Sequence, residues 1–491
     1  MPALTRIISR NTPGTYVNED TYGSIPAILS DHGSVYMLGT CTSNTVPFNT
    51  PIYISNLTDF KTQTISSPST NAAQLFFDQR SGSGFSFVRV AARKQVSFTV
   101  TMFAPGTVLT LTVNGVTVSY TCLTNDTVTT AKAGIIAGIN SAMVGTANHY
   151  LSGSTNIIRY TEIGLAPTSS AGIVLGVPSS SVNPLALDVA DAIKAAFVPE
   201  LPQGYLMAPE FYESMTSSIE RGTLQREMDA HCSDPSYYWV AVCDVGSTVA
   251  NSVNTIVADV TAERQGYASP RGNSWLTYPY LVNLAGVQVP SSPAQIGVAL
   301  RRARADGFIQ PPAGVNYPVY GVTGTSLNVT ASIQGQLNPQ GINCIRNLPG
   351  RGIVVYGART LSVNPYYRFG ATRVILNVLA GSLSKAFDSV LFTLVDGQGA
   401  LFSRIRQTAN NFCEQLRLAG GLFGATPEEA YLVVCDLTNN TLDSLESGAV
   451  YMDVIVKPSP TMEVLNITLS RASLSTVLAE VVSSGDTAPI T

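Results

Sequence analysis

The residues most capable of chemistry gather in one stretch, HCSDPSYYWVAVCD, which contains His231, Cys232, Asp234 and Cys243. A histidine beside a thiol and a carboxylate can form a nucleophile–base pair or bind a metal. If the stretch were extended, His231 and Cys232 would point to opposite faces, because neighbouring side chains of a strand alternate. The chain has only 3 histidines, which leaves few candidates for general-base chemistry. The pattern favours a structural role for this stretch.

Sequence motifs of common enzyme classes are missing from the chain. It contains no P-loop pattern, no G-x-S-x-G elbow, no H-E-x-x-H pair and no C-x-x-C pair. The glycines of NLPGRGIVVYGART resemble a phosphate-binding loop only loosely, because a strand pattern and not a helix start follows them. We interpret them as a turn that enters a strand. The sequence therefore predicts no enzyme, no metal site and no cofactor.

The composition indicates a protein built to assemble. Only 12% of the 491 residues are charged, against roughly 25% in average domains, while 45% are hydrophobic. We expect neighbouring copies to bury part of so weakly charged a surface. The net charge of −4 argues against a dedicated nucleic-acid binder. Without a long apolar run or a signal peptide, we expect a protein made and kept in a cytoplasm, with buried reduced cysteines.

Strand and helix patterns divide the chain into several parts. Residues 1–22 have the pattern of an arm, and short strands alternate with helices over 23–94 and 191–345, as in an α/β layer. Between these two segments, residues 95–190 carry only five charges and contain a hairpin, TVLTLTVNGVTVSYT, with Asn114-Gly115 as a type I′ turn. A helix, TTAKAGIIAGINSAM, follows the hairpin. We interpret 95–190 as an insertion domain.

Three further helices are predicted in the second half of the chain. The first begins at Ser292 as N-cap, with Pro293 in the first turn and Gln295 completing a capping box. The second, TRVILNVLAGSLSKAF, is apolar on two sides, as a helix buried on both sides would be. The third, LFSRIRQTANNFCEQLRLAGG, has one inward stripe. Strands are predicted for GIVVYG, EEAYLVVCD, AVYMDVIVKP and EVLNITLS, and a weakly patterned tail begins at Thr476.

Charge is distributed unevenly along the chain. Residues 301–387 contain nine basic residues and one acid, Asp306. Such a segment can pair with other copies of the chain or with an acidic partner. The alternative is pairing within the chain, and the candidate acids are Glu428, Glu429, Asp436, Asp443 and Glu446. For Arg301, Arg302 and Arg304, a solvated helix face and an ion-paired interface both remain open.

Four pieces of the sequence resemble the contractile bacteriophage tail sheath family, which is related to the sheaths of R-type bacteriocins. They are PGTYVNED, the run from SWLTYPYLV to ARADGFIQPPAG, the block INCIRNLPGRGIVVYGARTL, and the series from EEAYLVVCDLTNN to KPSP. The most specific block ends in Gly357, Ala358, Arg359, Thr360 and Leu361, and Tyr356 stands where the family commonly has Trp. The pieces span most of the chain outside 95–190.

The resemblance implies a multidomain α/β (α+β) fold. Its expected parts are an N-terminal linking arm (1–22), a subtilisin-like α/β central domain (23–94 and 191–345), a β-rich outer insertion domain (95–190), an α+β C-terminal sheath domain facing the tube (346–475) and a C-terminal tail (476–491). No histidine lies in a recognisable Asp–His–Ser motif, so the subtilisin-like fold does not imply proteolysis.

The resemblance also implies how subunits are linked. Extended arms at both ends of the chain would add strands to a neighbour's sheet, a form of β-augmentation. The candidate arm residues are Pro13, Gly14, Tyr16 and Val17 at one end and Leu465, Ile467 and Leu469 at the other. Arg404, Gln407 and Arg417, which lie outside the apolar stripe of their helix, are candidate contacts to the tube or to a neighbour.

The implied function is mechanical. Stacked hexameric rings of the subunit would surround an inner tail tube and contract to drive it through a host envelope for genome delivery. The implied partners are the chain itself, the tail tube protein, and baseplate and tail terminator proteins, in a virion whose parts are made in the bacterial cytoplasm; no nucleic acid or membrane is bound directly. Alternatives are the sheath of a phage-derived injection system or bacteriocin and, less favoured by the sequence, a tail-associated adhesin or hydrolase.

Overall fold

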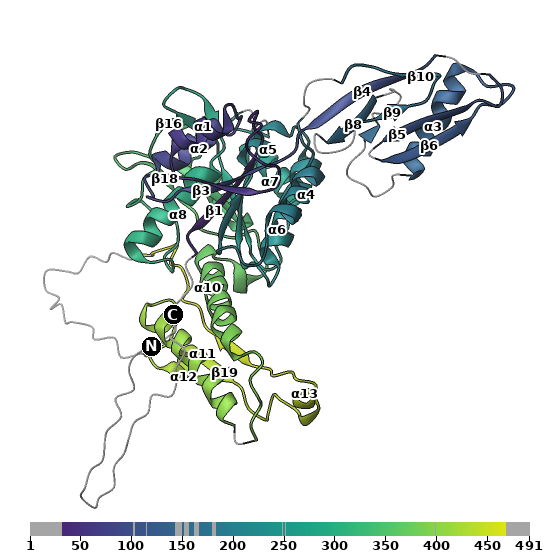
Figure 1. The fold of residues 1–491 in the computed structure, drawn as a ribbon. Helices are drawn as coiled ribbons and strands as arrows, with labels where there is room; N and C mark the ends of the chain where they lie inside the picture. Colours follow the sequence, from purple (N-terminus) through teal and green to yellow (C-terminus); the bar gives the residue numbers. More distant parts are fainter. Residues whose placement is uncertain are drawn as a thin grey trace, which may run out of the picture.

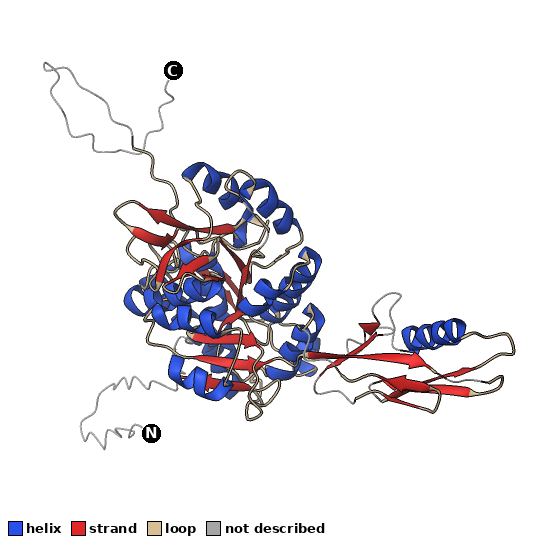
Figure 2. Ribbon diagram, turned by 90° about the horizontal axis from the view of Figure 1, so that it is seen from above, coloured by secondary structure: helices blue, strands red, loops and turns tan. Residues whose placement is uncertain are grey.

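The structure, a computed structural model, describes residues 32–101, 104–113, 115–142, 150–151, 157–161, 166–178, 183–247, 249–250, 252–397 and 399–467. The predicted arm over 1–22, with Pro13, Gly14, Tyr16 and Val17, lies outside these ranges, as do Leu469 and the tail from Thr476. The fold is mixed α/β, with several sheets and helices (Figures 1 and 2).

The largest element is an eight-stranded sheet with the order β18-β17-β13-β12-β11-β1-β3-β2. Its strands are β1 (Ser34–Gly39), β2 (Pro51–Ile54), β3 (Phe85–Arg89), β11 (Gly204–Met207), β12 (Val240–Asp244), β13 (Ser274–Tyr278), β17 (Ile342–Leu348) and β18 (Gly352–Val355). The six inner strands of this order, from β17 through to β3, run parallel to one another. The two edge strands, β2 and β18, are antiparallel to their neighbours. The strand GIVVYG, expected in the C-terminal domain, is therefore β18 of this sheet, and the expected boundary at 345/346 falls inside β17.

Helices cover both faces of this sheet, which explains why its parallel strands are buried almost throughout. One core cluster joins the sheet to α4 (Ala186–Ala196), α5 (Pro209–Ser214), α6 (Ser218–Ser233), α7 (Ile256–Gln265) and α9 (Ala331–Leu337). The other joins it to α1 (Leu57–Thr64), α2 (Thr70–Asp78) and α8 (Ser292–Asp306). Between β13 and β17, the chain also forms a small sheet of β14 (Leu281–Asn283), β15 (Gln288–Val289) and β16 (Val322–Thr325). Because α4 packs in the first cluster, the α/β layer resumes before residue 191.

A separate β-rich unit is inserted between β3 and α4, and it extends away from the large sheet (Figures 1 and 2). It consists of β4 (Arg93–Val100), β5 (Val108–Val113), β6 (Val116–Thr121), α3 (Val128–Ala142), β7 (Tyr150–Leu151), β8 (Ile157–Thr161), β9 (Thr168–Ser169) and β10 (Ile173–Leu175). The predicted hairpin is confirmed as β5 and β6, with Val113 paired to Val116. The predicted helix is α3. The unit has its own core cluster.

The C-terminal part is built on α10 (Gly370–Phe387) and α11 (Ala400–Leu418). It also contains α12 (Pro427–Ala430), α13 (Leu442–Glu446) and the antiparallel pair β19 (Tyr431–Val434) and β20 (Asp453–Val456). The two-sided burial predicted for α10 is confirmed. Val374 and Val378 belong to a core of the large sheet, whereas Ile375 and Leu379 belong to the C-terminal core.

The strand predicted over EVLNITLS is not formed in its described part. Residues 463–467 belong to no strand, and Leu465 and Ile467 are 68% and 71% exposed. A strand needs a partner for its backbone hydrogen bonds, and this segment has none within the described chain. The strand prediction is therefore wrong for residues 463–467, which lack the partner that a strand's backbone hydrogen bonds need.

Candidate functional site at the root of the C-terminal segment

The motif Gly357–Leu361 follows β18 and is fixed by an asparagine from the neighbouring strand. The Asn343 side chain of β17 donates from Nδ2 to the Arg359 carbonyl at 2.8 Å, and its Oδ1 accepts from the Arg359 backbone N–H at 2.7 Å. Asn343 is buried. The two bonds satisfy a buried amide and hold the backbone of Arg359 in one register.

The rest of the motif connects the large sheet to the start of α10. The backbone N–H of Leu361 donates to the Ser274 carbonyl at 2.9 Å, and that of Gly370 donates to the Ala358 carbonyl at 2.8 Å. The Thr360 hydroxyl donates to the Tyr367 carbonyl at 2.5 Å. A Cβ atom at Gly357 would lie 3.0 Å from Asn343 Cα, so glycine permits the close approach.

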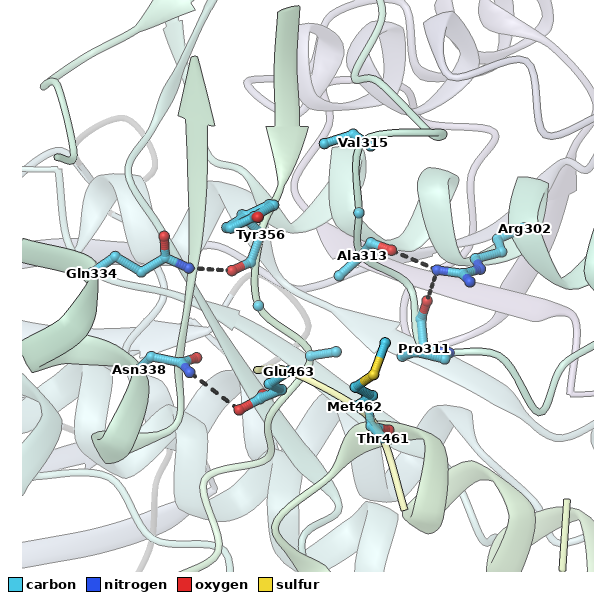
Figure 3. A pocket seen from close by; sticks show the side chains of 13 residues that line it. Arg302, Pro311, Ala313, Val315, Gln334, Asn338, Tyr356, Thr461, Met462 and Glu463 are labelled. Atoms are coloured by element: carbon cyan, nitrogen blue, oxygen red, sulfur yellow. Dashed lines mark hydrogen bonds between the residues drawn. The ribbon is translucent and has the colours of Figure 1, made fainter. Parts of the chain in front are cut away.

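Arg359 reaches from this junction to the C-terminal segment. Its Nε lies 3.1 Å from Glu463 Oε1, and its Nη2 lies 2.5 Å from Glu463 Oε2, a two-pronged ion pair. Asn338 Nδ2 donates to the same carboxylate at 3.4 Å, and Asn338 faces Glu463 in Figure 3. The side chains of Arg359 and Glu463 are only 16% and 20% exposed, so solvent screens the pair weakly.

A cavity of about 390 Å³ lies beside this ion pair (Figure 3). Thr461, Met462 and Glu463 of the C-terminal segment form part of its wall. The other lining residues are Arg302, Pro311, Ala313, Gly314, Val315, Gln334, Asn338, Tyr356, Gly357 and Ala358. Arg302 holds the opposite loop in place by donating to the carbonyls of Pro311 and Ala313 at 2.7 and 2.5 Å.

The C-terminal segment crosses from the C-terminal core back to the large sheet. The Ser459 backbone N–H donates to the Gly421 carbonyl at 2.9 Å, and Glu463 then binds Arg359. Beyond Glu463, the side chains of Val464, Leu465 and Ile467 are exposed. We call residues 459–463 the strap. The site can therefore hold a polypeptide segment against the large sheet.

Sequence reasoning identified Arg359 but not its partner. Glu463 lies 104 residues further along the chain, and no local pattern connects the two. Asn343, in contrast, is part of the sequence block INCIRNLPGRGIVVYGARTL, and the structure shows that it holds the backbone of Arg359. Of the other candidates, Arg404 and Gln407 lie on the exposed face of α11. Arg417 is engaged within the chain by Glu414 at 2.6 Å.

The stretch first considered for chemistry does not form a single site: Cys232 and Cys243 are buried, whereas Asp234 is exposed. His231 and Cys232 lie on α6, not on a strand, and Cys243 lies on β12. Among the aromatic rings around His231, that of Tyr237 is 4.1 Å away, and desolvation lowers the pKa of the histidine to about 4. Burial raises the pKa of the Cys232 thiol. A neutral imidazole and a neutral thiol in a core fit a structural role. The described ranges hold no group of three or more potential metal ligands.

A buried carboxylate caps α8 in place of the predicted N-cap. Ser291, not Ser292, is the N-cap residue, and its side chain makes no cap bond. Instead, Asp244 Oδ1 accepts the backbone N–H groups of Ser291 and Ser292 at 2.7 and 2.8 Å. Desolvation raises the pKa of Asp244 to about 6, although these hydrogen bonds oppose the shift. Asp244 is fully buried, so it meets no substrate and acts as an internal anion at the helix start.

The arginines of α8 bind the chain's own carbonyl groups. Arg301 donates to the Gln79 carbonyl at 3.1 Å, and its guanidinium lies 4.3 Å from the centre of the Tyr320 ring. Arg304 donates to the Gly82 carbonyl at 3.3 Å. Together with Arg302, which also pairs with Asp306 at 3.5 Å, they fix loops around the end of α8 and are not purely solvated. No helix in the described ranges is long and apolar enough to cross a membrane.

We compared the chain with protein-family models and with curated proteins. No family model matches the chain. A curated relative, the tail sheath protein of Vibrio phage KVP40, is 25% identical over 188 residues, which are 37% of this chain and 26% of the relative. The match thus spans about a quarter of that relative.

Solved sheath structures resemble a much larger part of the chain. The PVC sheath complex of an extracellular contractile injection system, in the contracted state, covers 94% of this chain and 98% of its own at a TM-score of 0.59 and 17% identity. The contracted helical sheath of the anti-feeding prophage covers 94% and 100% at 0.57 and 17% identity. The chain therefore has the fold of contractile sheath proteins, and its predicted resemblance to the tail sheath family is confirmed.

Proposed function

We propose that this chain is the structural subunit of a contractile tail sheath. Subunits would stack as hexameric rings around an inner tail tube and contract to drive the tube through a host envelope for genome delivery. The observation that carries the proposal is the fold match over 94% of the chain to a contracted sheath. The proposed partners are further copies, the tube protein, and baseplate and terminator proteins, within a phage tail.

We also propose a layout for the subunit. The eight-stranded sheet with its helices would form the subtilisin-like central domain, and the β-rich insertion from β4 to β10 would be outermost. The C-terminal domain, which begins after β18 and is built on α10 and α11, would face the tube, with Arg404 and Gln407 on its exposed helix face and Arg417 as a further contact. The relatives are structural proteins, which supports a mechanical rather than an enzymatic role.

The C-terminal segment supports linkage between subunits. Val464, Leu465 and Ile467 are exposed apolar residues that have no strand partner within the described chain. The β19–β20 pair is a sheet of two strands, and each outer edge lacks a partner strand in the described ranges. Strand addition satisfies both needs, because backbone hydrogen bonds supply affinity with little demand on sequence. The arm over 1–22 is proposed to act in the same way.

A second candidate is the sheath of a phage-derived injection system. The two solved structures described above come from such particles, and a shared fold does not separate them from phage tails. The two functions differ in what the tube delivers, not in the subunit's mechanics.

The direct test is negative-stain electron microscopy of the purified full chain, alone and with its tube protein. We expect hollow tubes with a regular helical repeat. Removal of residues 1–22 should leave folded monomers without tubes. A wild-type chain that stays monomeric even with the tube protein would overturn the proposal, and normal tubes from the truncated chain would overturn arm exchange at this end.

A further inference from the structure

A rigid, exposed loop follows the Gly357–Leu361 motif. We call residues 362–368 the tyrosine–arginine loop. Val363 and Tyr366 are 91% and 83% exposed, and Arg368 is also exposed. A short 3₁₀ helix (Pro365–Tyr367) shapes the loop, and the Asn364 side chain accepts the Tyr366 backbone N–H at 3.0 Å.

The loop is tied at both ends by hydrogen bonds to neighbouring segments. The Ser362 hydroxyl donates to the Pro270 carbonyl at 3.0 Å, and the Thr360 backbone N–H donates to the Arg368 carbonyl at 2.8 Å. An exposed apolar segment that is already ordered loses little conformational entropy on binding. Tyrosine and arginine are also the residue types most enriched at the energetic centres of protein interfaces.

The surroundings of the loop are cationic. The exposed Arg271 lies beside it, and Arg373 donates to the Arg271 carbonyl at 3.1 Å. Neither Arg271 nor Arg368 has an ion-pair partner in the ranges that the structure describes. The partner that fits this surface should therefore combine acidic and apolar side chains.

The chain itself carries such a surface on its C-terminal part. Residues 418–456 contain six acids and no Lys, Arg or His. Within them, Leu437, Leu442, Asp443 and Glu446 are exposed on and around α13. We call this group the acidic face. In Figure 1, α13 lies at the end of the C-terminal part that is farther from the large sheet.

The two surfaces do not satisfy each other within one subunit. In the described ranges, no ion pair joins a base of residues 301–387 to an acid of residues 418–456. The acid of this stretch that does form an ion pair, Asp436, binds Arg406 of α11 at 3.7 Å. Intrachain pairing of the basic segment with these acids is thus not observed in the described ranges, whereas Arg359 pairs with Glu463 and Arg302 with Asp306.

We propose that the tyrosine–arginine loop of one copy docks on the acidic face of a second copy. Different patches meet in such a contact, so it is heterologous and can propagate along a ring or a helix. Charge complementarity would orient the approach, while Val363 and Tyr366 would pack against Leu437 and Leu442. The proposal rests on the proposed assembly of the subunit but concerns a contact distinct from the terminal arms.

The first test is a cross-link between copies, which does not depend on tube formation. All seven native cysteines are buried, so introduced surface thiols react selectively. A full chain carrying Val363→Cys is mixed with one carrying Leu442→Cys under mild oxidation. We expect several-fold more disulfide-linked dimer than either variant gives alone. No excess over the single variants overturns the proposal, whether or not the wild type forms tubes.

The second test exchanges the charges. Arg368→Glu and the double change Asp443→Lys/Glu446→Lys should each weaken self-association about 10-fold or more in analytical ultracentrifugation at low salt. All three changes in one chain should restore most of it. Arg351→Glu, which reverses an exposed charge of the same basic segment outside the loop, is the matched control and should have little effect. Equal losses from the control and the loop variant, or no restoration, would overturn the proposal.

Discussion

Breaking the ion pair between Arg359 and Glu463 should release the strap. Glu463→Gln keeps the shape of the side chain and removes its charge, which leaves a guanidinium that is only 16% exposed without its counter-ion. A fully exposed pair contributes about 0–1 kcal/mol, and loss of one partner of a fully buried pair costs about 3–5 kcal/mol. Because both side chains are mostly but not fully covered, we expect a cost on the order of 1–2 kcal/mol.

Such a cost corresponds to an increase of about 5- to 30-fold in the population with the strap detached. Hydrogen exchange measured by mass spectrometry on the full chain reads this directly. The backbone amides of Lys457 and Ser459, which bond to the carbonyls of Ala430 and Gly421 at 2.9 Å, should exchange faster by that factor. Glu446→Gln makes the same chemical change on the surface of α13 and should leave these rates unchanged.

A double-mutant cycle separates the ion pair from other effects. If Arg359→Gln and Glu463→Gln act through their mutual contact, the combined variant should lose about as much as either single variant. Additive losses would mean that each side chain stabilises the strap independently. Exchange at the wild-type rate in Glu463→Gln would refute the reasoning altogether, because the strap would then be held by its backbone contacts alone.

Three further outcomes are expected. Replacing residues 93–182 with a short Gly/Ser linker should leave a cooperative thermal transition by circular dichroism, because Ala92 and Asn183 line one common cavity; loss of the transition would count against an independent insertion. Burial raises the pKa of Asp244 from its ordinary value of 3.8 to about 6, so protonation of this carboxyl stabilises the fold fully below pH about 4, and this stabilisation is lost as the pH rises through 6. In denaturant titrations, the free energy of unfolding of the wild type should therefore rise by up to about 3 kcal/mol from pH 7 to pH 4, relative to that of Asp244→Asn. Asn343→Ala should lower the free energy of unfolding by about 1–3 kcal/mol, whereas Asn347→Ala, at an exposed position of the same strand, should change it by less than about 0.5 kcal/mol.

Local patterns predicted the elements whose stability is local or amphipathic. The hairpin of β5 and β6 follows from alternation around Asn114-Gly115, and α11 follows from a single apolar stripe. The two apolar sides of α10 predicted that it would be buried on two sides, and the structure shows that each side belongs to a different core. In each case the deciding contacts are short in sequence or are set by which face is apolar.

What the sequence left open depends on contacts between distant residues. The cap of α8 comes from Asp244, 47 residues before Ser291, so the local Ser-Pro-x-Gln pattern misassigned the N-cap. The partner of Arg359 lies 104 residues away. The alternation around Leu465 and Ile467 matches a strand, yet a strand forms only where another edge receives it. Such long-range pairings leave no periodic trace in one sequence.

The position of α10 has a mechanical consequence. A helix of 18 residues is about 27 Å long at 1.5 Å per residue, and its apolar side chains are shared between two cores. Because each buried Val, Ile or Leu contributes about 1.5–3 kcal/mol, the helix cannot swivel at its middle without uncovering one of the two cores. The helix is therefore a rigid connection and not a hinge, and a torque applied to the C-terminal part turns the large sheet with it. Shape change in an assembly of such subunits must therefore occur between whole subunits and not at the middle of α10.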